Sequence, residues 1–110
     1  MIDEGSASAS EIFTGAIKDY KLGTLVGTKT FGKGVVQTTF YRDRDGFSDG
    51  TALKVTISKY YTPNGQNIHG IGIEPDILVE YPEELKGKNY DRTVDPQFQK
   101  ALEVAKEKIK

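Results

Sequence analysis

The sequence predicts an α/β (α+β) fragment: a mixed sheet of about four short strands, with one helix near the N-terminus and one at the C-terminus. Two stretches, beginning at Ile12 and Phe98, carry apolar residues at spacings of three and four, which is typical of amphipathic helices. Residues 51–60 alternate apolar and polar side chains, which is typical of a half-buried strand. Shorter β-branched or apolar runs predict three further strands, at residues 24–27, 35–40 and 77–79.

The ends of the two helices carry recognisable signals. The first helix is expected to run to about Tyr20, followed by Lys21-Leu22-Gly23, with a basic residue and a glycine where helix ends favour them. The second is expected to begin with Asp95 as its cap and Pro96 as its first residue. Its apolar stripe needs a partner, in this domain or in another copy, and comprises Phe98, Ala101, Leu102, Ala105 and Ile109. The sequence thus divides into a core, residues 1–95, and an amphipathic helix, residues 96–110.

Composition excludes several classes of function. The 110 residues suit one small domain, and a formal net charge of −1 gives no basic face for nucleic acid or for an anionic membrane. The absence of cysteine excludes disulfides, thiol catalysis and cysteine-ligated zinc. No apolar run is long enough to span a bilayer, and the N-terminus lacks the features of a signal peptide. Any export signal must therefore lie outside these residues.

Ser8 lies in a turn of small residues, Gly5-Ser-Ala-Ser-Ala-Ser10, at the start of the first helix. Backbone N–H groups at a helix N-terminus lack intrahelical partners, so an anionic oxygen beside Ser8 would be stabilised there. Ser8 is therefore a candidate nucleophile. Ser8-Ala9-Ser10-Glu11 also fits a capping box, in which Ser8 caps the helix and Glu11 bonds back to it. From the residues alone, both interpretations stay open.

A serine nucleophile needs a proton acceptor, and Lys33 is the best placed candidate. Glycine on both sides permits close approach of another segment, and Phe31 and Val35 are candidates for its dry surroundings. Lowering the pKa of a lysine from its usual value to near neutrality takes about three units, or about 4 kcal/mol, which requires burial. The simpler alternative is an exposed turn with a solvated lysine. The only histidine, His69, lies in a glycine-rich loop without a second metal ligand nearby.

Two further patterns bear on this loop. Residues 27–33 match the first seven positions of the phosphate-binding G-x-x-x-x-G-K-[ST] pattern, but Gly34 replaces the hydroxyl and the following residues are strand-like. Phosphate binding is therefore a remote alternative. In that strand Gln37 falls on the same side as Lys33 if the extension begins at the lysine, so its amide is a candidate to orient the amine.

The charged residues 41–50 are expected to form a solvated hairpin end rather than a calcium loop.

Several motifs, taken together, resemble the carboxyl-terminal processing peptidases, the tail-specific serine proteases of family S41 that use a Ser-Lys dyad. The resemblance covers about three quarters of the chain, and 33 − 8 = 25 residues separate its serine from its lysine, as the family pattern implies. The motifs follow in order: Gly5-Ser-Ala-Ser-Ala-Ser-Glu-Ile12, Gly15-Ala-Ile-Lys-Asp-Tyr20, Thr30-Phe-Gly-Lys-Gly34 with Gln37, Lys59-Tyr-Tyr-Thr-Pro63 and Gly72-Ile-Glu-Pro-Asp76.

The resemblance implies a role for each candidate residue, within a piece of a ClpP/crotonase-like core. Ser8 would attack the scissile carbonyl, Lys33 would move its proton, Gln37 would position the lysine, and the Ala9 N–H would be one oxyanion donor. No metal or cofactor is implied. The partners implied are protein or peptide substrates with free C-termini, in a parent protein that is exported and carries a PDZ domain absent from these residues.

The abrupt start, Met1-Ile2-Asp3-Glu4, resembles the end of a strand, and suggests an excerpt of a longer protein. Residues 1–95 would then be a partial peptidase core. Because the family's second oxyanion donor and earlier strands lie outside it, we expect the excerpt alone to have little or no activity. The alternative from another functional class is a non-catalytic binding or oligomerisation module that associates through the C-terminal helix, with homo-oligomers as one outcome.

Overall fold

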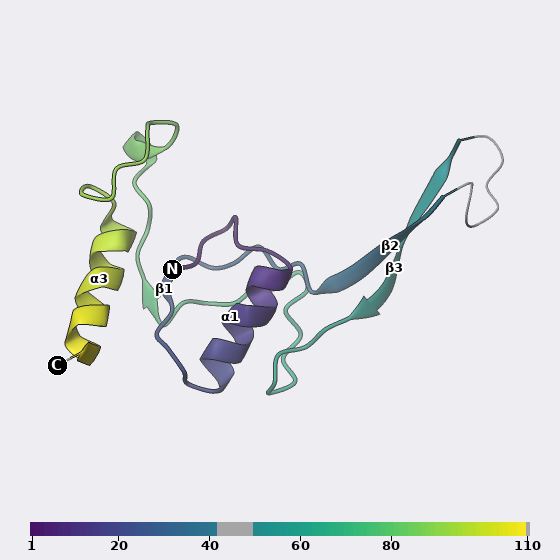
Figure 1. Cartoon of the computed structure of the whole chain (residues 1–110), viewed down its shortest axis with the longest axis horizontal. Helices are drawn as coiled ribbons and strands as arrows, with labels where there is room; N and C mark the ends of the chain where they lie inside the picture. The colour runs from purple at the N-terminus through teal and green to yellow at the C-terminus, as the bar shows by residue number, and fades with distance from the viewer. Residues whose placement is uncertain (42–49, 110) are drawn as a thin grey trace.

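The structure is a computed structural model that describes residues 1–41 and 50–109. It is elongated, with principal extents of 60 × 37 × 22 Å. Helix α1 (Ala9–Asp19) lies near the middle, the ribbon of strands β2 (Val35–Tyr41) and β3 (Ala52–Lys59) projects to one side, and helix α3 (Pro96–Ile109) lies on the other (Figure 1). The expected hairpin end falls outside the described residues, apart from Tyr41 and Gly50.

The expected first helix is confirmed as α1, but it ends differently from the prediction. Tyr20 is its C-terminal capping residue, and Lys21 then adopts a left-handed conformation with φ of 55°. The Leu22 N–H donates to the Ile17 carbonyl (2.9 Å) and the Lys21 N–H to that of Lys18 (3.0 Å). This pair of bonds is a Schellman motif. The predicted capping glycine, Gly23, comes two residues too late to take part, so Lys21 occupies the position that glycine favours.

The predicted α/β class and the four short strands are confirmed, and they pair as two separate ladders. Strand β1 (Val26–Gly27) pairs in parallel with β4 (Ile77–Leu78), while β2 pairs antiparallel with β3. The register of the second ladder shifts between Val36 and Gln37, because Val36 faces Ser58 and Gln37 faces Thr56. One extra residue of β3, Ile57, is accommodated there as a bulge, which bends the ribbon where it leaves the body of the molecule.

The expectation that one face of the 51–60 strand packs is wrong for most of its length. Leu53 and Ile57 are 48% and 58% exposed, and only Val55 on that face is half-buried. The physical reason is that β2 and β3 extend away from the other elements as a two-stranded ribbon, so no layer among the described residues covers either face (Figure 1). The sequence pattern specified the strand correctly, while its partner surface depends on tertiary context.

The C-terminal part has more regular structure than the sequence indicated. The sequence predicted no helix or strand between residues 79 and 95, but this stretch contains the 3₁₀-helix η1 (Glu83–Leu85). The predicted start of α3 is confirmed: Pro96 is its first residue, and Asp95 Oδ1 accepts the N–H groups of Gln97 (2.8 Å) and Phe98 (3.2 Å).

Helix α3 packs against β1, with a stripe slightly rotated from the predicted one. Ala101, Val104 and Ala105 line a small cavity together with Leu22 and Val26. Val104 was not in the predicted stripe, whereas two predicted members are exposed, Leu102 to 37% and Ile109 to 85%. Because β1 is only two residues long, it covers only part of the apolar face of α3. Within the described residues, neither helix combines the length and apolar character needed to cross a bilayer.

The core is small and lies between the N-terminal segment, β1 and the loop before β4. It consists of Ile2, Leu25, Ile68 and Ile73, with Ile17 and Tyr60 packed against it. The N-terminal segment is tied in by backbone bonds, with the Ile2 N–H donating to the Val26 carbonyl (2.9 Å) and the Thr28 N–H to that of Ile2 (3.0 Å). This cluster therefore supports the chain segments that flank the site described below.

Ile68→Ala should lower the free energy of unfolding by about 2–5 kcal/mol, because Ile68 is 1% exposed and its truncation leaves a cavity in the core. Urea denaturation of both proteins measures the difference. Ile71→Ala is the matched control, since Ile71 is 50% exposed and lies three residues away. Equal losses in the two variants would contradict this description of the core.

Candidate active site

Ser8 occupies a strained turn immediately before α1. Its backbone angles, φ 57° and ψ −116°, lie close to those of a residue that a type II′ turn usually fills with glycine. A side-chain-bearing residue in such a conformation costs about 1–3 kcal/mol and persists only where its surroundings enforce it. The nucleophilic serines of α/β-hydrolases are presented on sharp, strained turns of this kind before a helix. The backbone at Ser8 is therefore more strained than a helix start requires.

The loop that carries Lys33 lies tightly against residues 68–72, as its flanking glycines predicted. A Cβ atom on Gly32 would lie 2.9 Å from the Gly72 nitrogen, and one on Gly34 would lie 2.7 Å from the His69 nitrogen. Lys33 itself is half-buried. Of the two apolar neighbours expected to shield it, Val35 is buried but Phe31 is 66% exposed. Phe31 was therefore the wrong choice: its N–H is bonded to the Ser6 carbonyl (3.0 Å), while its ring lies in solvent.

The fully buried carboxylate of Glu11 joins the serine turn to the lysine loop. Its Oε2 accepts the backbone N–H of Ser8 (3.0 Å) and that of Lys33 (2.7 Å). Its Oε1 accepts the N–H of Gly32 (2.7 Å) and the hydroxyl of Thr30 (2.6 Å). Four donors therefore fill the acceptor positions of one carboxylate. This single side chain therefore connects the lysine loop to the serine turn, which the backbone bond from Phe31 to Ser6 also joins.

These bonds also set the charge of Glu11. Burial alone raises its pKa, but the hydrogen bond from Thr30 and the backbone bonds from Lys33, Gly32 and Ser8 outweigh this effect and hold the pKa below 4.5. Glu11 is therefore an anion at neutral pH. The Thr30 hydroxyl in turn accepts the N–H of Ile73 (2.8 Å), a core residue, so the carboxylate is connected to the core.

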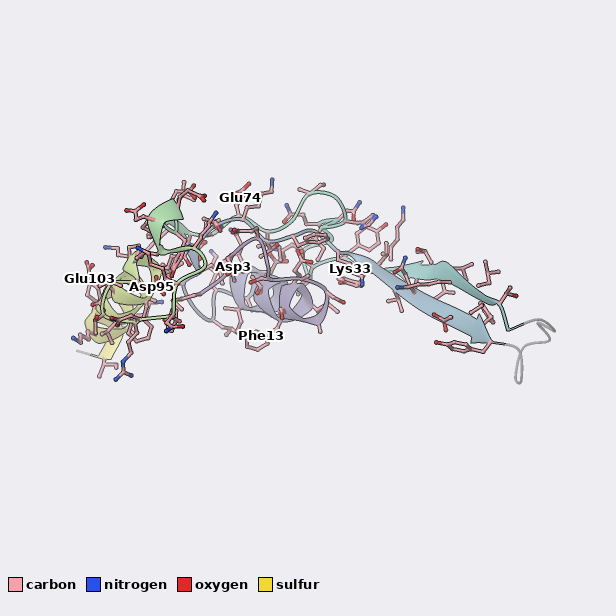
Figure 2. The ribbon with its side chains drawn as sticks, turned by 90° about the horizontal axis from the view of Figure 1, so that it is seen from above. Asp3, Phe13, Lys33, Glu74, Asp95 and Glu103 are labelled. Carbon is pink, nitrogen blue, oxygen red and sulfur yellow. The ribbon has the colours of Figure 1, made fainter. Side chains whose placement is uncertain are left out.

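The structure brings all four sequence-predicted site residues to one cavity of about 300 Å³. Figure 2 shows Lys33 where the β2–β3 ribbon meets the body of the molecule, near α1. The residues lining the cavity are Ser8, Ala9, Ile12, Lys33, Val35, Val36, Gln37, Lys54 and Tyr60. A larger cavity, about 500 Å³, lies between the N-terminal segment and the Tyr81 to Gln97 region, and it contains none of the predicted residues.

Gln37 and Ala9 differ in how their polar groups are engaged. The side-chain amide of Gln37 donates to Thr56 Oγ1 across the ribbon (3.4 Å). Among the described residues, no hydrogen bond joins this amide to Lys33. Its expected role in orienting the amine stays a prediction. The Ala9 N–H takes part in no hydrogen bond within the described part of the chain, as expected for the first residue of a helix. It is therefore available to a ligand in the cavity.

Sequence reasoning missed three residues of this site. Glu11 was recognised only as half of a capping box, and nothing in the sequence indicated that its carboxylate also reaches residues 30–33. Lys54 and Tyr60 line the cavity from β3 and the residue after it. Tyr60 stands in one of the family motifs, which was the available signal. Lys54 had no signal beyond its place on the polar face of a predicted strand.

The phosphate-binding alternative from the sequence is not favoured by the geometry. The residues after Lys33 form β2, whereas a phosphate-binding loop of the pattern considered above opens a helix. His69 is exposed, and its backbone N–H donates to Asn67 Oδ1 (3.0 Å). Across residues 1–41 and 50–109, no group of three or more metal-ligating side chains is positioned to hold an ion.

The protein should lose stability at acidic pH in a way that depends on Glu11. Because its pKa is depressed by folding, its contribution is complete above 4.5 and is lost as the pH falls through the lower folded-state value. Urea midpoints measured from neutral pH to about pH 3 should fall steeply, and Glu11→Gln should flatten this fall. Asp19, whose pKa is lowered by hydrogen bonds from Thr62 and Asn64, accounts for part of the remaining dependence. An unchanged pH dependence in Glu11→Gln would contradict the assignment.

The chain is similar to several known proteins. Residues 1–79 match peptidase family S41. A Staphylococcus aureus (strain COL) protein named "Probable CtpA-like serine protease" is 56% identical over 82 residues, which is 74% of this chain and 16% of that protein. A protein of the same name from Staphylococcus haemolyticus (strain JCSC1435) is 54% identical over 83 residues, 76% of this chain and 16% of that one.

Among solved structures, the photosystem II D1 C-terminal processing protease superposes with a TM-score of 0.61 at 42% identity, covering 76% of this chain and 21% of that chain. The chain therefore spans only 16% of the length of the relatives named above. The expected resemblance to the C-terminal processing peptidases is confirmed. On the match over residues 1–79, the chain belongs to peptidase family S41.

Proposed function

We propose that this chain supplies the nucleophile and general base of a serine endopeptidase that cleaves near the C-termini of protein substrates. The observation that carries the proposal is the meeting of Ser8 and Lys33 at one cavity, held there by a shared carboxylate. The names of the relatives support a serine protease, and that of the D1 processing protease supports a substrate cut near its C-terminus.

In the proposed reaction, the Lys33 amine accepts the proton of the Ser8 hydroxyl as Oγ bonds to the scissile carbonyl carbon. The resulting oxyanion lies near the N-terminus of α1, where the Ala9 N–H is unpaired among the described residues and the helix dipole is positive. Lys33 then protonates the departing amine, the C–N bond breaks, and an acyl-enzyme ester remains. Water, deprotonated by Lys33, hydrolyses this ester and restores Ser8. Gln37 is proposed to position the lysine.

The strained backbone at Ser8 is consistent with this role. A helix cap requires an oxygen near the first N–H groups, but it does not require the φ of 57° that Ser8 adopts. The bond from the Ser8 N–H to Glu11 and the adjoining helix hold that conformation. Strain of this sort is found where a side chain must be presented to a ligand, and the Ser8 side chain lines the cavity.

The rest of the parent protein belongs to the same proposal. We propose a PDZ domain and further sheet strands elsewhere in the protein, export from the cytoplasm, and little activity in the 110 residues alone. The support is the resemblance to relatives of which this chain covers 16%. The second candidate function, a non-catalytic binding or oligomerisation module, is favoured by the exposed Leu102 and Ile109 on α3.

The two candidates differ in the reactivity of Ser8. In the full-length protein, a fluorophosphonate probe should label Ser8. The variants Ser8→Ala and Lys33→Ala should reduce both labelling and peptide hydrolysis by about 10³-fold or more. Ser10→Ala and Lys29→Ala are matched controls, because Ser10 is exposed in the first turn of α1 and Lys29 is exposed in the lysine loop, paired with Glu74 (3.1 Å). Equal labelling of all five proteins would exclude the catalytic assignment and leave the binding module.

A further inference from the structure

Tyr60 contacts the lysine loop at two consecutive carbonyl groups. Its hydroxyl donates a hydrogen bond to the Lys33 carbonyl oxygen, and its backbone N–H donates to the Gly34 carbonyl (3.1 Å). It follows β3 directly and belongs to the Lys59-Tyr-Tyr-Thr-Pro63 motif, to which the reaction proposed above assigns no role. The structure therefore places a side chain from after the ribbon against the loop that precedes it.

Both backbone polar groups of Lys33 are consequently held by side chains from other elements. The N–H is bonded to Glu11 of α1 (2.7 Å), and the carbonyl oxygen is bonded to Tyr60. Fixing the peptide groups on both sides of a residue fixes the direction of its Cα–Cβ bond, since that bond follows from the backbone dihedrals. For a lysine, whose side chain is long and flexible, this direction decides where the amine can reach.

The Tyr60 ring is itself anchored. It is half-buried, packs against the core cluster of Ile2, Leu25, Ile68 and Ile73, and forms one wall of the cavity that Ser8 and Lys33 line. A tyrosine has few rotatable bonds, so a packed ring places its hydroxyl with little conformational freedom. The core therefore determines where the bond to Lys33 forms.

We propose that Tyr60 is a positioning residue for the general base: its hydroxyl holds the Lys33 backbone so that the amine points at Ser8. This inference rests on the proposed function, because it gives Lys33 the role assigned there. It adds a requirement of its own, namely that the hydrogen bond from the hydroxyl, and not only the ring, contributes to the rate.

Tyr60→Phe tests that requirement because it keeps the ring in the core and in the cavity wall while removing the hydrogen bond. In the protein at its native length, we expect kcat for a peptide substrate to fall roughly ten- to hundredfold with KM within about twofold, as for a displaced catalytic group.

The adjacent tyrosine provides a matched control. Tyr61 is 56% exposed and does not line the cavity, so Tyr61→Phe should keep the native kcat and KM. Urea denaturation of the same proteins shows whether Tyr60→Phe remains fully folded under the assay conditions, which a positioning role requires.

The outcomes separate this inference from the proposed function. If Lys33→Ala is inactive while Tyr60→Phe keeps the native kcat, the positioning role is wrong and the Ser-Lys assignment stands. If Tyr60→Phe loses activity only in proportion to lost folded protein, Tyr60 is a core residue and the positioning role is again wrong. If Lys33→Ala retains native activity, both proposals fail.

Discussion

The arrangement of the whole site depends on one buried carboxylate. Glu11 accepts hydrogen bonds from the backbone of Ser8 and from that of Gly32 and Lys33, which lie 21 and 22 residues further along the chain. A buried anion is unfavourable unless its acceptor positions are filled, so any movement of the serine turn or the lysine loop leaves charge uncompensated. The carboxylate thereby holds together the serine turn and the lysine loop. The backbone bond from Phe31 to Ser6 also joins them.

The same carboxylate reconciles two interpretations of Ser8 that the sequence presented as alternatives. The Glu11 carboxylate accepts the Ser8 N–H, as the capping-box interpretation requires, and the turn is also strained and open to a cavity. One group thus stabilises the helix start, enforces the Ser8 backbone conformation and positions the lysine loop. Tyr60 acts on the far side of Lys33, so the lysine backbone is held from both α1 and the segment after β3.

The sequence predicted local features well and long-range ones poorly. The starts of both helices followed from Ser8 and Pro96, because capping chemistry is local, and the lysine loop followed from two glycines that allow close approach. The exposed faces of Leu53 and Ile57 were mispredicted because alternation specifies a strand but not what covers it. The bonds from Glu11 to the lysine loop, and from Tyr60 to Lys33, connect residues 22 and 27 positions apart, and no periodicity encodes such contacts.

The claim that one carboxylate joins both halves of the site is tested most directly by a pH titration of backbone amide NMR signals. The account predicts that the amide resonances of Ser8, Gly32 and Lys33 shift together, with one shared midpoint below the ordinary glutamate value of 4.5. Three separate midpoints, or amides that do not respond while Glu11 titrates at its ordinary value, would contradict it.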